Sequence, residues 1–150
     1  MLKLVATGTA LGLIAFLALC VAFGGDAVGP LLLTPASMLL GGFVLLMGWL
    51  VAAYSARNLR GQRRQARYAV LLATAIGALW LMVVAEPLVL MALGWTVSGL
   101  AIAGLVAHSD TASARSASRR VAGRLLVGDV ALWTAVVLLL SAGVSGRAGL

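Results

Sequence analysis

Charged residues are scarce in this sequence. Of its 150 residues, only 10% are Asp, Glu, Lys or Arg, whereas 63% are hydrophobic and the mean hydropathy is +1.11. A soluble domain carries about a quarter charged residues, because its surface has to face water. Too little polar sequence is present here to cover a globule of this length. The composition therefore excludes an ordinary soluble domain and predicts that the solvent is lipid.

Residues that carry chemistry are equally few. The chain has one cysteine, Cys20, and one histidine, His108. A single cysteine can form no internal disulfide and cannot make a metal site alone. The apolar run around Cys20 continues beyond it, so we expect an uncleaved first helix rather than a signal peptide. No Walker loop, dinucleotide fingerprint, histidine pair or catalytic Ser/His/Asp set occurs. The sequence predicts no metal and no cofactor, and it disfavours a membrane enzyme in its own right.

Long apolar runs are what the sequence does contain. Five of them are long enough to cross a hydrocarbon core of about 30 Å, which takes roughly 20 helical residues. The runs are continuous and lack the alternation of lipid-facing strands, so helices are favoured over a barrel. We therefore expect an all-α membrane protein, a single bundle of about five transmembrane helices. Their expected ranges are 4–24, 36–56, 68–85, 87–107 and 121–143.

The basic residues outside these spans are distributed unevenly. Lys3, five arginines in 57–67 and three in 108–120 fall on one side of the predicted membrane, and only Arg147 falls on the other. Basic residues in short loops stay on the cytoplasmic face, which predicts a cytoplasmic N-terminus. The net charge of +7 is then mainly a topology signal. The bilayer is the expected partner, and nucleic acid is not, because no basic domain exists to bind it.

Polar groups inside a membrane are costly and therefore informative. Asp129 lies within the fifth predicted span, and its short side chain must face protein, water or a cation, or be protonated. Glu86 stands at the predicted turn between the third and fourth spans, where a wetted hairpin is the simpler interpretation. His108 lies where the fourth span ends, as a solvated helix end or as a proton relay. These three residues are the candidates for a proton path.

Two arginines flank the fifth predicted span. Arg124 lies one turn inside it, where a long side chain can extend its charge to the interface. Arg120 lies at its start. Both are candidates for marking the helix end or for pairing with another group.

The stretch "VVAEPLVLMALGWTVSGL", residues 83–100, carries a family resemblance. It resembles the antiporter-like, proton-translocating membrane subunits of NADH:quinone oxidoreductase, in the subunit L or chain 5 branch. That branch includes the membrane subunits of cation/proton antiporters and of inorganic-carbon transporters. Two further blocks, "LTPASMLLGGFVLLMGWLVAAYSARNLRGQRRQARYAVLL" and "RSASRRVAGRLLVGDVALW", are similar in order and spacing. Their matching residues are Pro35, Ser37, Tyr54, Ser55, Gly61, Arg67, Tyr68, Arg120, Gly128, Asp129 and Leu132.

The departures from this family concern its proton-carrying residues. The membrane-embedded glutamate of the family falls at Thr96, whose hydroxyl does not ionise at accessible pH. Thr96 is expected at most to hydrogen-bond its own helix or to hold a water. Lys3 is the only lysine, so no residue matches the buried lysines of the family. The resemblance therefore covers only the N-terminal part of such a subunit.

The resemblance implies a membrane subunit, or the N-terminal piece of one, from a proton- or cation-translocating complex. Such a chain would not conduct alone and would be at most a non-catalytic part of the complex. Other membrane subunits would be its partners, and the bacterial cytoplasmic (inner) membrane its location. The alternative is a small structural or assembly membrane protein that keeps the fold and has lost ion translocation. The missing glutamate and lysine favour this alternative.

Overall fold

The computed structural model describes residues 2–23, 27–28, 31–32, 34–59, 64–109 and 111–143. Over these ranges the chain forms five long helices, one short 3-10 helix and one two-residue antiparallel strand pair. The elements are α1 (Leu2–Phe23), β1 (Ala27–Val28), β2 (Leu31–Leu32), α2 (Pro35–Asn58), α3 (Gln65–Val84), α4 (Leu88–Val106), η1 (Ala107–Ser109) and α5 (Ala112–Ser141).

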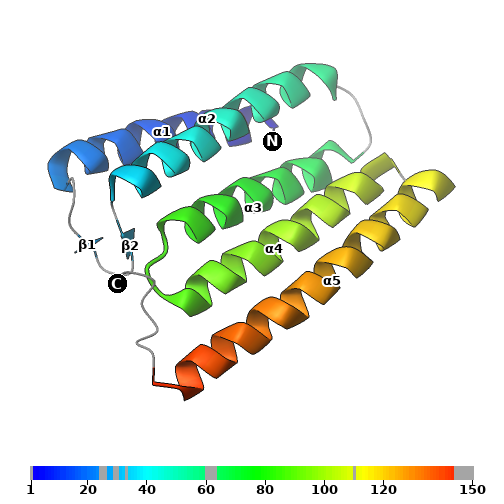
Figure 1. Cartoon of the computed structure of the whole chain (residues 1–150). Coiled ribbons are helices and arrows are strands. Elements are labelled where there is room, and N and C mark those ends of the chain that lie inside the picture. The colour runs from blue at the N-terminus through cyan, green and yellow to red at the C-terminus, as the bar shows by residue number, and fades with distance from the viewer. Residues whose placement is uncertain are drawn as a thin grey trace.

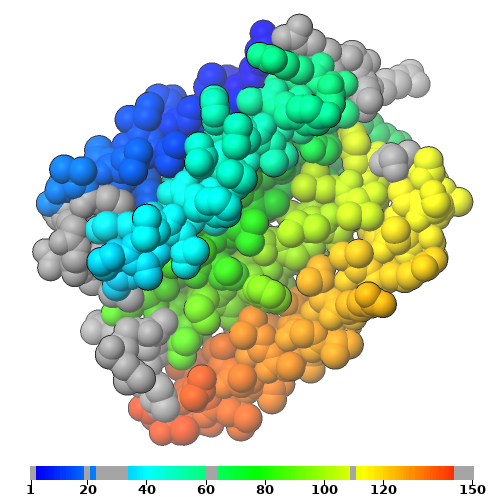
Figure 2. Space-filling model, turned by 45° about the horizontal axis from the view of Figure 1, so that its top comes forward, coloured from blue at the N-terminus to red at the C-terminus, as the bar shows by residue number. Residues whose placement is uncertain are grey.

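Consecutive helices run in alternating directions and pack as neighbours (Figure 1). The helix α1 packs along α2 and also reaches α3, while α3, α4 and α5 follow side by side. The strand pair and the α3–α4 connection lie toward one end of the bundle. The start of α1, the end of α2 and η1 lie toward the other end. The order along the chain is thus also the order in space, and α5 forms one edge (Figure 2).

Local capping explains where two of the helices begin. Thr34 precedes α2, and its Oγ1 accepts a hydrogen bond from the backbone N–H of Ser37 at 3.2 Å. Pro35 follows as the first helical residue, where its missing N–H costs nothing. Thr111 caps α5 in the same way, with its Oγ1 accepting from the N–H of Ala114 at 3.1 Å.

The cap at Thr111 accounts for one difference from the predicted ranges. The fifth helix begins at Ala112, whereas its apolar run predicted a start at 121 and a polar loop over 108–120. The Ala and Arg residues of this polar segment are strong helix formers, and Thr111 satisfies a backbone N–H at the start. Arg115 and Arg120 therefore lie in helix. The other four helices begin and end within three residues of the predicted ranges.

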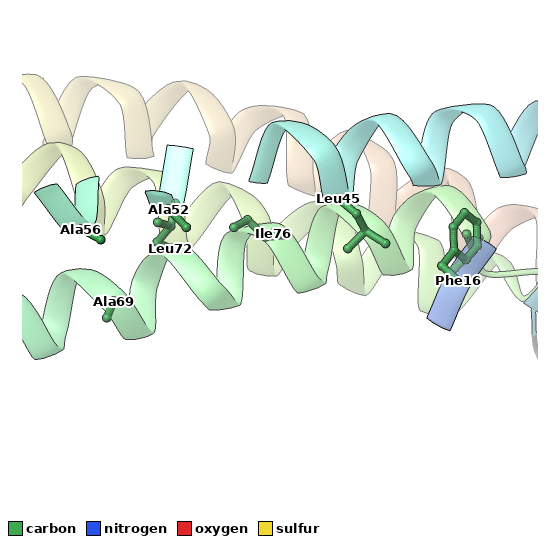
Figure 3. Close-up of a cluster of buried hydrophobic side chains, with 8 residues drawn as sticks. Phe16, Leu45, Ala52, Ala56, Ala69, Leu72 and Ile76 are labelled. Carbon is green, nitrogen blue, oxygen red and sulfur yellow. The ribbon is translucent and has the colours of Figure 1, made fainter. Parts of the chain in front are cut away.

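The core lies between the first three helices and consists largely of small and branched apolar residues (Figure 3). Phe16 of α1 packs over Gly41 of α2, where an added Cβ would lie 3.0 Å from the ring. Gly48 makes room for Ile76 of α3 in the same manner. The buried cluster comprises Phe16, Leu45, Ala52, Ala56, Ala69, Leu72, Ile76 and Val84. Small residues thus let the helix backbones approach closely, as is usual in membrane bundles.

The outer surface is apolar. Among the described residues, α2, α3, α4 and α5 are long and apolar enough to cross a membrane, and α1 contributes a shorter apolar stretch, Lys3–Ala18. Large side chains such as Leu40, Leu100 and Leu138 are more than half exposed. In water such a surface would aggregate, whereas in lipid it is the ordinary outer face of a bundle. The chain is a multi-pass, all-α membrane protein.

Candidate functional site

The side chain of Thr96 joins α4 to α5. Its Oγ1 accepts a hydrogen bond from Nε1 of Trp133 at 3.1 Å. Thr96 lies halfway along the 19-residue helix α4, so this bond lies deep in the bilayer. The expectation that Thr96 bonds at most to its own helix or to a water is therefore wrong. An indole N–H in lipid needs an acceptor, and the neighbouring helix supplies it.

Two glycines set the distance of α4 from its neighbours. A Cβ added to Gly94 would lie 2.7 Å from the carbonyl oxygen of Ala78 and 2.9 Å from the backbone N of Met82. The backbones of α3 and α4 therefore meet at Gly94. A Cβ on Gly99 would lie 3.3 Å from Leu125, which packs over it from α5. Together these contacts hold Thr96 between a close backbone crossing on one side and α5 on the other.

Asp129 lies on the face of α5 that contacts α4. It follows Leu125 and precedes Trp133 by four residues, and residues at that spacing share one side of a helix. Leu125 contacts Gly99 and Trp133 bonds Thr96, so Asp129 stands between two contacts with α4. Its Oδ1 is buried and has no hydrogen-bond partner among the described residues. The α4–α5 seam, defined here as Thr96, Gly99, Leu125, Asp129 and Trp133, is the candidate functional site.

The residue after Thr96 has a different environment. Val97 is 38% exposed and lines a groove of about 310 Å³ between α3 and α4. Thr96 is not among the residues of that groove, and its hydroxyl oxygen bonds Trp133 instead. Thr96 and Val97 therefore lie on two different faces of α4: Thr96 faces α5, and Val97 faces a groove open to lipid.

His108 belongs to a second polar cluster at the end of the bundle. Its ring packs edge-on against the ring of Tyr68, with centroids 5.1 Å apart. The hydroxyl of Tyr68 shares a hydrogen bond of 3.1 Å with Oγ of Ser55, which is buried in α2. The Nδ1 of His108 is buried without a hydrogen-bond partner in the described part of the chain. This cluster links α2, α3 and η1 and lies apart from the α4–α5 seam.

Glu86 lies at the opposite end of α4. It stands in the short connection between α3 and α4, half-buried, before Pro87. The 19 residues of α4 separate it from His108 by about 28 Å at 1.5 Å per residue. The structure therefore does not bring the three predicted proton-path residues together. Glu86 and His108 mark the two ends of α4, and Asp129 lies between those levels on α5.

The two arginines at the start of the fifth predicted span are exposed on α5. Arg120 and Arg124 lie one turn apart, and no ion pair joins either of them to Asp129 within the described residues. Arg124 precedes Asp129 by five residues, which places the two side chains on different faces. Pairing of these arginines with Asp129 is therefore not observed. Their role at the helix end stays a prediction.

Trp133 is a seam residue that the sequence-based prediction did not single out. A usable signal was present, because a tryptophan in the middle of a span cannot use the interface to satisfy its N–H. It also stands four residues after Asp129, on the same helix face.

No metal centre accompanies the seam. Over the ranges that the structure describes, no three His, Cys, Asp or Glu side chains come together in a way that could hold a metal ion. No protein-family model matches the chain, and no curated protein or solved structure is significantly similar to it. The residues of the α4–α5 seam offer hydrogen bonds and one carboxyl group.

Proposed function

We propose that the chain is a membrane subunit, or the N-terminal piece of one, of a proton- or cation-translocating complex similar to NADH:quinone oxidoreductase subunit L. In this proposal the chain contributes structure to the complex and does not conduct alone. Its partners are other membrane subunits. Its location is the bacterial cytoplasmic membrane, with the N-terminus on the cytoplasmic side, where the basic loops would stay.

The observation that carries the proposal is the direction in which Thr96 faces. This residue stands where the resembling subunits place a membrane-embedded glutamate, and its side chain bonds a neighbouring helix at mid-membrane. Asp129, which belongs to another block of the resemblance, lies on the same seam with a buried, unpartnered carboxyl oxygen. Two independent sequence blocks thus meet at one polar interface, which supports a common origin with an intramembrane proton site.

The same seam argues against conduction by this chain alone. A proton path needs a series of ionisable groups or ordered water through the bilayer. Thr96 cannot ionise, and its oxygen is occupied by the indole of Trp133. Asp129 has no ionisable neighbour on the seam, because Glu86 and His108 lie toward the two ends of α4. Conduction would therefore require groups from another subunit.

The first experiment tests conduction. The purified chain is reconstituted into liposomes with a trapped pH dye, and an imposed pH gradient is followed. We expect the gradient to decay as slowly as in protein-free liposomes. A clear leak that Asp129→Asn abolishes would contradict the proposal that the chain does not conduct alone.

A second experiment separates the complex subunit from the structural alternative. The chain carries an affinity tag in its native membrane, is extracted in mild detergent, and its particle is sized and its components sequenced. We expect a larger particle that contains a subunit with intramembrane Lys and Glu, and loss of proton pumping in inverted vesicles when the chain is deleted. A particle without such a subunit, together with unchanged pumping, favours the structural or assembly role.

A further inference from the structure

A groove lies between α1 and α2 at the basic end of the bundle. It has a volume of about 260 Å³, several times the ~30 Å³ that one water occupies in the liquid. Figure 2 shows the two helices that form it running side by side. The described residues that line it are Lys3, Ala6, Thr7, Ala53, Ala56 and Arg57.

The charges of this groove all have one sign. Lys3 lines the groove from the start of α1 and Arg57 from the last turn of α2, so two cationic residues from different helices border one space. No acidic side chain is among the described residues that line it. The hydroxyl of Thr7 donates to the backbone carbonyl oxygens of Lys3 and Leu4, at 3.0 Å each, so its proton stays within α1. Lys3 and Arg57 are therefore the lining residues whose side chains can donate to a ligand at the groove, and their charge suits an anion.

The floor of the groove is apolar and small. Ala6, Ala53 and Ala56 leave space between the helices while offering nothing that would hydrate a free ion. A small anion such as inorganic phosphate would lose its water there without a full set of donors in return. A phosphate diester that carries its own apolar chains fits this combination of two cations above an apolar floor.

Both helices extend the groove toward the middle of the membrane with exposed apolar residues. On α1, Leu11 and Ile14 continue the face of Lys3 and Thr7 at four- and three-residue steps, and they are 66% and 64% exposed. On α2, Leu50 and Leu46 continue the face of Arg57 and Ala53 in the other direction, and both are exposed. The groove thus opens onto a surface along which acyl chains would lie.

We propose that this groove binds the headgroup of an anionic phospholipid, with Lys3 and Arg57 holding its phosphate and the acyl chains lying along Leu11, Ile14 and Leu50. Basic pockets between membrane helices bind acidic headgroups in this way. The site is independent of the α4–α5 seam and of any ion transport, because none of its residues belongs to that seam.

Lipid retention tests the proposal. The purified chain in mild detergent receives equal amounts of phosphatidylglycerol and phosphatidylcholine, and native mass spectrometry measures which lipid stays bound. We expect preferential retention of phosphatidylglycerol. Lys3→Gln with Arg57→Gln should lower that retention by roughly tenfold or more, because each cation contributes about fivefold. The matched control, Arg119→Gln with Arg120→Gln, removes two exposed cations of α5 and should leave retention unchanged.

Three outcomes would overturn the proposal. Equal loss in both double variants would mean that the net positive charge, and not the groove, attracts the lipid. Displacement of the lipid by a comparable concentration of inorganic phosphate would identify a free phosphate as the ligand. The third outcome concerns another variant, Ala53→Leu, which keeps both cations but fills the floor of the groove. This variant serves if the charge variant does not fold, and its helix content by circular dichroism should match that of the wild type. Undiminished lipid retention in Ala53→Leu would exclude the groove as the binding site.

Discussion

Thr96 and Trp133 join α4 to α5 by a neutral hydrogen bond. The indole of Trp133 donates and the threonine hydroxyl accepts, so neither group carries a charge into the bilayer. A carboxylate at the same depth would cost several kcal/mol unless protein or water faced it. The pair therefore keeps a polar contact between α4 and α5 without the free-energy cost of a buried charge. Such a neutral contact suits a helix interface better than a proton relay.

The strength of this bond can be measured with a double-mutant cycle. Thr96→Val removes the acceptor at nearly constant shape, and Trp133→Phe removes the donor while keeping an aromatic ring. We expect a coupling free energy of about 0.6 kcal/mol, and at most about 1.7, as found for hydrogen bonds between membrane helices. Thermal unfolding of the wild type, both single variants and the double variant in detergent gives the value. A coupling indistinguishable from zero would mean that the bond contributes no stability.

Introducing a glutamate at position 96 tests whether this side of α4 accepts a carboxyl group. Thr96→Glu puts a carboxyl group against α5, where the indole of Trp133 can donate to it, whereas Val97→Glu puts one into the lipid-facing α3–α4 groove. An acidic residue facing lipid costs of order 2.5–3.5 kcal/mol on insertion scales. We expect higher membrane expression and a higher unfolding temperature for Thr96→Glu than for Val97→Glu. Equal disruption by the two changes would show that position 96 accepts a carboxyl group no better than the lipid-facing position 97.

The helices α3 and α4 are coupled by a backbone contact rather than by large side chains. Gly94 meets the main chain of α3 at Ala78 and Met82, and backbone atoms cannot rotate away as a side-chain end can. The neighbouring helix α5 is attached differently. Its one buried residue over Ala112–Ser141 is Val136, so it contacts the bundle along one side and exposes the remainder. The third and fourth helices therefore form a closely packed pair, and α5 is the element whose outer face is left for lipid or a partner.

A pair of alanine substitutions tests this contact. Gly94→Ala would place a Cβ 2.7 Å from the carbonyl oxygen of Ala78, so the helices must separate. We expect a loss of about 1–3 kcal/mol from overpacking, offset in part by the gain of about 1 kcal/mol that alanine brings to a helix. Gly77→Ala on α3 is the control, because nothing lies within 4 Å of its added Cβ, and it should be neutral or stabilising. Unfolding temperatures that fall equally for both variants would argue against a close backbone crossing.

The whole bundle separates charge between its two ends. The helix ends that carry Lys3 and Arg57 lie toward one end of the bundle, and the α3–α4 connection that carries Glu86 lies toward the other. The extension of α5 back to Ala112 adds Arg115 and Arg119 to the basic end as part of a helix that is 30 residues long. About 20 residues of α5 suffice to cross the hydrocarbon, so its first turns project beyond it. One membrane surface is therefore strongly basic, as the positive-inside tendency requires.

This uneven distribution of charge predicts from which side of the membrane each connection can be labelled. In a Cys20→Ala background, single cysteines at Gly61 and Ser113 should react with a membrane-impermeant maleimide only when the cytoplasmic face is accessible, as in inverted vesicles. A cysteine at Glu86 should react from the other side and serves as the control. Labelling of position 61 or 113 in intact cells would contradict the predicted cytoplasmic location of these positions.

Hydropathy and charge were enough to obtain the class of this protein, the number of helices and the end that is basic. These are local properties, because a span needs only about 20 apolar residues and a flanking arginine acts within a few residues of the membrane surface. Thr96 and Asp129 could be selected for the same reason, since any polar group in an apolar run is conspicuous. The early start of α5 was missed, because a polar Ser/Ala/Arg segment reads as a loop when only hydrophobicity is considered.

The contacts of the selected residues depend on how the helices are rotated and paired. Thr96 meets Trp133 across 37 positions of sequence, and the groove of Lys3 and Arg57 joins the first turn of one helix to the last turn of the next. In lipid the outer and inner faces of a helix are almost equally apolar, so composition does not indicate which side faces a neighbour. The rotation of a helix is decided by close packing at positions such as Gly94 and Gly99. Which atoms of the neighbouring helices contact these glycines is known only from the assembled structure. Packing therefore placed Thr96 against Trp133 and Asp129 on the seam, whereas hydrophobicity alone placed both in the membrane.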